Sequence, residues 1–210
     1  MYQVVLSTLK NKKSTFLDAG CCFGQELRKL ASDGAPPETL YGLDLEPAFI
    51  EMGFELFRDR EKLSGATFLS GDMLDAKRQW PELEGSIDYI FANSLLHLFP
   101  RPQQLEMACR LASFARDRPG SLIIGRQVGA VVPGEFRALS EGSTYFRHNP
   151  ESFDALWREV GRLTGTRWKT NAYLDMKDIA ENASAGPKWM DEHSRRLHFV
   201  VERVDLNANL

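Results

Sequence analysis

The sequence predicts an α/β fold built on a Rossmann-like sheet of seven strands, mostly parallel and with a terminal antiparallel strand. Three observations predict this fold. Short apolar runs alternate with helical segments through the first two-thirds of the 210 residues, which is typical of βαβ units. A glycine-containing turn directly follows the first of these runs. Two longer alternating runs close the chain, as expected for an antiparallel pair at the end of a sheet.

Five short runs rich in apolar residues are expected to form the parallel strands. They are residues 16–19, 40–43, 66–69, 87–92 and 122–124. Helices are expected at residues 25–32, from Pro47 and from Pro102. Apolar residues recur there with a period of 3.6, and proline favours the first helical position.

The final third begins with a helix that Asn149 and Pro150 start and Gly165 ends, since these residue types cap helices at those positions. Residues 168–175 and 196–204 are the expected antiparallel strands, and residues 181–194, rich in small and polar types, are expected to form the loop between them. No repeat or linker divides the chain. We therefore expect residues 1–210 to form a single domain.

Composition excludes several classes of protein. The net charge is −3 and no dense stripe of lysine and arginine is present, so nucleic acid is not an expected partner. No apolar run is long enough to span a membrane, and no cluster of side chains has the spacing of metal ligands. Cys21 and Cys22 are adjacent and Cys109 has no evident partner, which predicts a reducing, cytoplasmic location. The oligomeric state stays open between a monomer and a homodimer.

The ends of the first two expected strands carry residues suited to a ligand. In open α/β sheets ligands bind beyond the carboxyl ends of the strands. The first strand leads into a turn with Asp18, Gly20, Cys22 and Gly24, where small residues let backbone amides at a helix start approach a ligand closely. The second strand ends at Asp44, whose carboxylate could accept two hydrogen bonds from a ribose diol.

Two further strand ends are also polar. Asp72, within the Gly71-Asp72-Met73 turn, is suited to accept a hydrogen bond from an exocyclic amine, and Asn93 and Ser94 follow the fourth strand. Each feature alone has an ordinary explanation as turn geometry, a helix cap or a surface loop. Their joint order is much harder to explain in this way, so the sequence predicts a site for a nucleoside-containing cofactor.

The residue pattern narrows the choice of cofactor. The dinucleotide fingerprint requires G-x-G-x-x-G, whereas Cys22 and Gln25 stand where the second and third glycines would be. No phosphate-binding GKS or GKT sequence is present either. An acidic rim without nearby lysine or arginine suits a cofactor with a ribose and an amine but no phosphate. S-adenosylmethionine has this chemistry.

Four segments resemble the cofactor-binding motifs of class I S-adenosylmethionine-dependent methyltransferases, in the same order. They are FLDAGCCFGQELRKL, YGLDLEPAFIEMG, FLSGDMLDA and DYIFANSLLHLF. More narrowly, four segments resemble fungal secondary-metabolism methyltransferases, including meroterpenoid-pathway enzymes that esterify a carboxylic acid. These are DAGCCFGQ, GLDLEPAFI, GRQVG and TYFRHNPESFDALWREVGRLTGTRW. The resemblance implies the class I methyltransferase fold and S-adenosylmethionine as cofactor.

The resemblance also implies roles for the residues of the first two strand ends. Asp18 and Gly20 would face the methionine part of the cofactor, and Gly24 would shape the turn. Asp44 would bind the ribose hydroxyls, and Leu45 would pack beside the adenine. These roles agree with the chemistry expected of an acidic rim.

At the other two strand ends, the resemblance implies that Asp72 accepts a hydrogen bond from the adenine amine and that the backbone of Met73 reads the ring. Asn93 and Ser94 would lie against the cofactor near the methyl donor. One departure concerns Cys22, which stands where the common class I pattern has glycine. Because the narrower group shares this residue, we expect an altered loop geometry with cofactor binding retained.

Four residues are candidates for the acceptor side. His97 is the candidate general base for a hydroxyl acceptor, and Arg126, just after the fifth expected strand, could hold a carboxylate with two hydrogen bonds. Arg147 and His148, before the next helix, could also contact substrate. Each has a structural alternative: a buried or capping histidine for His97, a surface salt bridge for Arg126, and helix capping for the other two.

Three functions are consistent with these observations. The favoured one is an O-methyltransferase acting on a small acid of polyketide or terpenoid type. A second is a cofactor-binding but inactive chain, because the resembling enzymes have a longer segment before the first strand, which often acts as a lid. A third is a methyltransferase acting on a hydroxyl, on a protein or on RNA, although no basic or extended groove is evident for a macromolecule.

Overall fold

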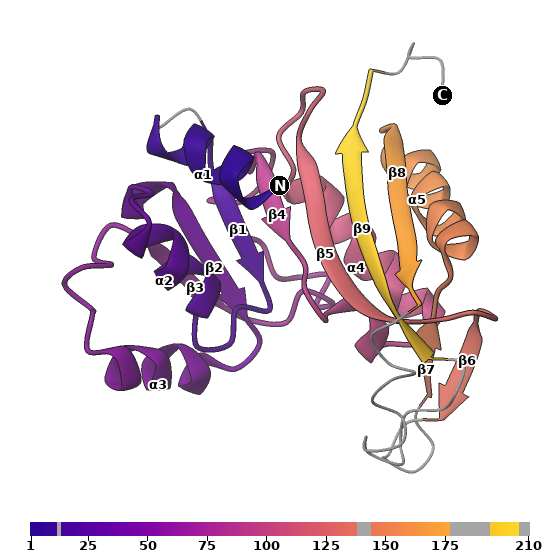
Figure 1. Ribbon diagram of the computed structural model, residues 1–210, viewed down its shortest axis with the longest axis horizontal. Helices are drawn as coiled ribbons and strands as arrows, with labels where there is room; N and C mark the ends of the chain where they lie inside the picture. Colours follow the sequence, from indigo (N-terminus) through magenta and orange to yellow (C-terminus); the bar gives the residue numbers. More distant parts are fainter. Residues whose placement is uncertain (12–13, 138–143, 177–193, 206–210) are drawn as a thin grey trace. The chain divides into compact units, whose positions relative to one another are not determined.

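The computed structural model describes residues 1–11, 14–137, 144–176 and 194–205. The chain divides into two compact units, each described by itself (Figure 1). The first contains Met1–Ala92 and Ser113–Asp117, and the second contains Asn93–Ala112 and Arg118–Leu210.

The first unit is a parallel sheet with helices beside it. Its helices are α1 (Tyr2–Lys10), α2 (Gln25–Ser32), the 3-10 turn η1 (Pro37–Thr39) and α3 (Pro47–Phe57). Its strands are β1 (Phe16–Ala19), β2 (Leu40–Asp44), β3 (Thr67–Ser70) and β4 (Tyr89–Phe91). Strand β1 pairs in parallel with β2 and β4, and β2 pairs in parallel with β3. The carboxyl ends of β1 to β4 therefore share one edge, as the βαβ pattern predicts.

The second unit is built on antiparallel pairs. Its strands are β5 (Leu122–Ala130), β6 (Gly134–Arg137), β7 (Thr144–Arg147), β8 (Trp168–Asp175) and β9 (Ser194–Arg203). Its helices are η2 (Leu96–Leu98), α5 (Pro150–Thr164) and α4 (Arg101–Phe114), whose last two residues belong to the first unit. Strand β9 pairs antiparallel with both β5 and β8, β6 and β7 form a separate hairpin, and α5 lies along β8 (Figure 1).

The seven strands follow the order β3-β2-β1-β4-β5-β9-β8. This confirms the expected seven-stranded, mostly parallel α/β fold. The antiparallel pair at its end is also confirmed, since β8 matches the expected range 168–175. The reversed strand, β9, lies between β5 and β8, so β8 is the outermost strand.

Local sequence explains the helix ends. The Asn149 side chain accepts a hydrogen bond from the Ser152 amide at 2.9 Å, and the Ser152 hydroxyl accepts one from the Asn149 amide at 3.1 Å. This reciprocal capping box starts α5, and Gly165 ends the helix in the left-handed region with φ 66°. On α3, Pro47 is the first residue and the Glu46 side chain accepts from the Ala48 amide. Pro47, Asn149, Pro150 and Gly165 lie at the helix ends that the sequence predicted, whereas the capping roles of Glu46 and Ser152 were not predicted.

Three features differ from expectation: one strand boundary and two elements that were not predicted. Strand β5 continues to Ala130 instead of ending at residue 124, because nine residue pairs join it to β9 in spite of Gly125 and Gly129, which weaken a strand signal. Helix α1 was not predicted; it buries Val5, Leu6 and Leu9. The short hairpin of β6 and β7 was missed as well. The expected loop 181–194 lies outside the described residues except for Ser194, which begins β9.

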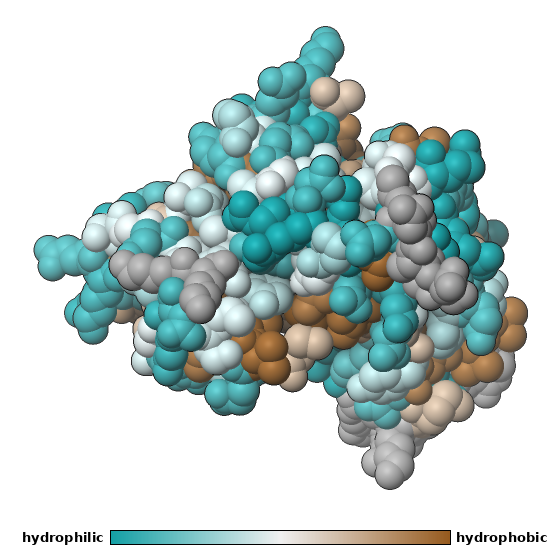
Figure 2. All heavy atoms as spheres, turned by 90° about the horizontal axis from the view of Figure 1, so that it is seen from above, coloured by the Kyte–Doolittle hydropathy of each residue, from teal (hydrophilic) through white to brown (hydrophobic). Residues whose placement is uncertain are grey.

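The outer surface carries mainly polar side chains. Figure 2 shows hydrophilic residues over most of one face, with apolar residues gathered in smaller groups. Among the described residues, no helix has the length and the apolar composition needed to cross a membrane. The apolar side chains are concentrated in the core, where Leu17, Leu43 and Ile90 in the first unit and Phe153 and Trp157 in the second are fully buried.

Candidate functional site

The turn after β1 has an unusual backbone. Gly20, Cys22 and Gly24 all have positive φ, at 81°, 49° and 69°. A side chain on Gly24 would lie 2.7 Å from Nη1 of Arg28 and 3.0 Å from the Phe68 ring, so both conformation and space require glycine there. The amides of Gly20 and Cys21 donate to the Leu43 carbonyl. The turn is therefore held against the end of β2.

Asp44 connects this turn to the next one. Its Oδ2 accepts a hydrogen bond from the Cys22 amide at 2.6 Å, and its Oδ1 accepts one from the Glu46 amide at 3.0 Å. The side chain is buried at 8% exposure. Hydrogen bonds to a charged acceptor are the stronger kind. Asp44 thus fixes two loops at adjacent strand ends; the sequence suggested a capping role towards the second loop as an alternative, but not the bond to the first.

Asp18 is a buried acid at the end of β1. Its side chain is 5% exposed, and the charged groups that act on it are both acids. Burial raises the pKa of this carboxyl to about 7, with a further contribution from the carboxylates of Glu26 and Asp44. A buried acid surrounded by acids favours a cationic partner. The position suits an ammonium group.

We expect this raised pKa to reduce stability as pH rises. Between about pH 4 and pH 7 the unfolded chain has lost the Asp18 proton while the folded chain keeps it, so the free energy of unfolding falls over this range and levels above it. Asp18→Asn should remove this fall. Urea unfolding of both proteins from pH 4 to pH 8 measures it, with Glu55→Gln on the exposed side of α3 as control. Parallel profiles for the original protein and Asp18→Asn would contradict the assignment.

The residues expected to surround an adenine differ in exposure. Leu45 is 67% exposed directly after Asp44, whereas the Met73 side chain is buried. Asp72 is exposed, and its Oδ1 accepts a hydrogen bond from the Leu74 amide at 2.8 Å. An exposed apolar side chain beside a strand end is available to pack on a planar ring. All of these residues belong to the first unit.

Cys22 occupies the left-handed region that ordinarily favours glycine. A side chain there costs about 1 to 2 kcal/mol, partly offset by the greater chain entropy of an unfolded glycine. We therefore expect Cys22→Gly to raise the free energy of unfolding by about 0.5 to 1 kcal/mol. Urea unfolding at pH 7 would measure the gain. Cys22→Ala, which keeps Cβ and removes only the thiol, should give no such gain; equal gains for both variants would argue against strain.

Asn93 and Ser94 belong to the second unit. Oδ1 of Asn93 is buried without a hydrogen-bond partner among the described residues. Ser94 has φ 55°, and its amide donates to the Arg126 carbonyl at 2.7 Å. A buried oxygen without a partner is costly. This favours Asn93 as a group that accepts a hydrogen bond from a ligand.

His97 lies in η2, close enough to Arg147 for their charges to interact. Burial and the positive charge of Arg147 together lower the pKa of His97 to about 4, so the ring is neutral at physiological pH. Arg147 is 2% exposed; its guanidinium donates to the Tyr145 and Ser194 hydroxyls and lies 4.3 Å from the centre of the Phe136 ring. The missed hairpin supplies two of these partners.

The other two acceptor candidates differ in burial. Arg126 is exposed and lies within β5, opposite His198 in the register, so its predicted place after the strand is wrong. The reason is that pairing with β9 prolongs β5. His148 is fully buried, with Nδ1 2.9 Å from the Ser152 hydroxyl, and burial and the Arg101 charge lower its pKa to about 3. The contact with Ser152 holds His148 against the first turn of α5.

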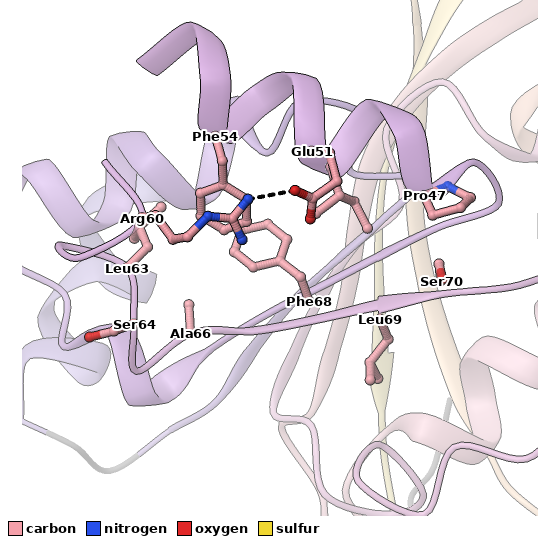
Figure 3. A pocket seen from close by; sticks show the side chains of 11 residues that line it. Pro47, Glu51, Phe54, Arg60, Leu63, Ser64, Ala66, Phe68, Leu69 and Ser70 are labelled. Atoms are coloured by element: carbon pink, nitrogen blue, oxygen red, sulfur yellow. Dashed lines mark hydrogen bonds and ion pairs between the residues drawn. The ribbon is translucent and has the colours of Figure 1, made fainter. Parts of the chain in front are cut away.

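A pocket of about 410 Å³ lies in the first unit, between α3 and β3. Figure 3 shows the Phe54 and Phe68 rings in contact on one side of β3, the Arg60 and Glu51 ion pair above them, and Leu69 pointing away. None of its lining residues is a predicted site residue. The pocket therefore does not replace the strand ends as the candidate site.

Comparison with protein families finds a methyltransferase-domain model that matches residues 10–154. The chain is 39% identical to O-methyltransferase phiE of Fungal sp. (strain ATCC 74256) over 97% of this chain and 71% of that protein. It is also 39% identical to O-methyltransferase atr3 of Stereocaulon alpinum, over 97% of this chain and 58% of that protein. Methyltransferase trt5 of Aspergillus terreus is 34% identical over 79% and 60%. The chain thus spans 58% to 71% of these relatives.

Solved structures with the same fold are more distant in sequence. The magnesium protoporphyrin IX methyltransferase ChlM of Synechocystis with bound S-adenosylmethionine has a TM-score of 0.52 at 20% identity, covering 96% of this chain and 77% of that one. The methyltransferase domain of the bacterial Hen1 protein CtHen1-CN has a TM-score of 0.62 at 15% identity, covering 96% of both chains. At these identities the similarity establishes a shared fold and nothing more.

Proposed function

Because the chain belongs to the class I S-adenosylmethionine-dependent methyltransferases, we propose that it transfers the cofactor's methyl group to an oxygen of a small secondary metabolite. The proposed acceptor is a carboxylic acid of polyketide or terpenoid type, and the product is a methyl ester. The observation that carries this function is the site at the ends of β1 and β2, where Asp44 fixes two loops and Asp18 lies buried beside two other acids.

The residues present fit the cofactor. Asp18 would face the ammonium of the methionine part, and Asp44 has lone pairs beyond its two backbone bonds for the ribose hydroxyls. Leu45 would cover the adenine, and Asp72 would accept from its amine. Bound S-adenosylmethionine supplies an electrophilic methyl group on a sulfonium. The protein's own contribution is to hold the cofactor in place and to exclude water from the acceptor.

The electrostatics of the second unit favour an acid as acceptor. A carboxylate is already ionised and needs no base, and the exposed Arg126 could bind it through two hydrogen bonds. A hydroxyl would need a base, and a base is most effective when its pKa lies near the working pH. A pKa of about 4 makes His97 a poor base at neutral pH. The relatives named as O-methyltransferases support transfer to oxygen.

A screen of acceptors tests the proposal. The protein would be incubated with methyl-labelled S-adenosylmethionine and a set of fungal carboxylic acids and phenols, and the products analysed by mass spectrometry. Labelled methyl esters are expected. Labelled methyl ethers alone would identify a hydroxyl as the acceptor, and transfer only to a protein or an RNA would overturn the small-molecule assignment.

A second candidate is a cofactor-binding chain without activity. Calorimetric binding of S-adenosylhomocysteine together with no turnover in the acceptor screen would support it. For the active enzyme we further propose a cytosolic location, since the three cysteines are free.

A further inference from the structure

Gln104 is a fully buried polar residue of α4 to which the sequence assigned no role. Its side-chain Nε2 donates to the Phe99 carbonyl at 2.8 Å and to the Phe146 carbonyl at 2.7 Å. The Phe146 amide in turn donates to the Phe99 carbonyl at 2.9 Å. One amide group therefore joins the segment after η2 to strand β7, two parts of the second unit that are far apart in the sequence.

Each of these two segments carries a candidate acceptor residue. His97 lies two residues before Phe99, and Arg147 directly follows Phe146. Their separation determines how strongly the Arg147 charge acts on the His97 ring. The guanidinium of Arg147 is itself held by Tyr145 and Ser194. At the other end, Phe99 directly follows η2, and its carbonyl accepts one hydrogen bond from Gln104 and one from the Phe146 amide.

We propose that Gln104 is a positioning residue that keeps η2 against β7 and so sets the place of His97 relative to Arg147. Its importance for acceptor binding rests on the proposed function, while its effect on His97 does not. Nothing in the local sequence could have indicated it, because a buried glutamine on a helix has no characteristic pattern. Its Oε1 is buried without a hydrogen-bond partner among the described residues, so burying this side chain carries a cost that its two donated bonds offset.

The first test measures the His97 ring directly. Gln104→Met keeps the length of the side chain and removes both donated bonds, which leaves η2 less tightly held. The pKa of His97, followed by NMR titration of the ring protons, should rise from about 4 toward 6.5 because the ring becomes more solvated and lies farther from Arg147. Gln103→Met, an exposed neighbour on the same helix, is the matched control and should leave this pKa unchanged.

A second variant keeps the proposal testable if Gln104→Met fails to fold. Gln104→Glu has nearly the same shape, and a buried carboxyl beside two carbonyl oxygens should stay protonated and donate one bond. The His97 pKa should then lie between those of the original protein and Gln104→Met. A His97 pKa that neither variant moves would overturn the proposal.

Kinetics separate this inference from the function on which it partly rests. With the acceptor that the screen selects, Gln104→Met should raise the acceptor KM about tenfold or more, since small misplacements of positioned groups have large effects. S-adenosylhomocysteine affinity should stay within about twofold, because the predicted cofactor residues Asp44 and Asp72 are held by hydrogen bonds that do not involve Gln104. If no acceptor is found but the His97 pKa moves, the positioning role stands and the proposed function fails. If an acceptor is found but neither its KM nor the His97 pKa changes, the positioning role of Gln104 is wrong and the proposed function is unaffected.

Discussion

Replacing Asp44 by alanine is expected to lower the affinity for S-adenosylmethionine and S-adenosylhomocysteine by tenfold or more. Hydrogen bonds to a charged group contribute about 1.5 to 3 kcal/mol each, and tenfold corresponds to about 1.4 kcal/mol. The variant would lose the bonds to the ribose hydroxyls. It would also release the Cys22 and Glu46 amides that the carboxylate now holds at 2.6 Å and 3.0 Å. The loops on both sides of the cofactor would then be less well placed.

Calorimetric titration with S-adenosylhomocysteine measures this loss without any need for an acceptor. Glu46→Gln is a suitable control, because it keeps an oxygen that can cap Ala48 in the same turn and should bind normally. Asp44→Asn would separate charge from volume: its amide can accept on one side only, so one of the two backbone donors would lose its partner. An affinity unchanged by Asp44→Ala would defeat the assignment of this cofactor site.

The second large effect concerns the chemistry of the acceptor. If the acceptor is a carboxylic acid, as proposed, Arg126→Ala should raise the acceptor KM strongly, because the carboxylate would lose charge-assisted hydrogen bonds that contribute about 1.5 to 3 kcal/mol each. His97→Ala should then matter little. If the acceptor is a hydroxyl, His97→Ala should lower kcat by about 10² to 10⁴, and Arg126→Ala should have little effect.

Steady-state kinetics of the two single variants decide between these outcomes. Arg147→Ala is not a clean comparison, because that side chain is buried against Phe136 and bonded to Tyr145 and Ser194, so its loss would also disturb the hairpin. The pH profile adds an independent reading. With a pKa of about 4, His97 is neutral above pH 5, so base catalysis by this residue would leave kcat flat from pH 6 upward. Near-normal kinetics for both Arg126→Ala and His97→Ala would show that Arg126 does not bind the acceptor and that His97 is not the base.

The order of elements and the acidic strand ends could be predicted from the sequence. The pattern of apolar residues located β1, α2 and β8 at their observed bounds, because β1 is a short, fully buried run, α2 has the period of a helix and β8 that of a half-buried strand. Asp18, Asp44 and Asp72 could be singled out because parallel strands bring their carboxyl ends to one edge. Capping chemistry in the same way located both ends of α5.

What only the tertiary structure decided depends on partners far away in the sequence. The extension of β5 past Ile124 comes from pairing with β9, more than sixty positions on, and this pairing is what places Arg126 within a strand. The hairpin of β6 and β7 has too few residues for a periodic signal, yet it surrounds Arg147. The pKa values of Asp18 and His97 follow from burial and from charges on other elements. Desolvation and Coulomb interactions act through space, so no pattern of neighbouring residues could have revealed them.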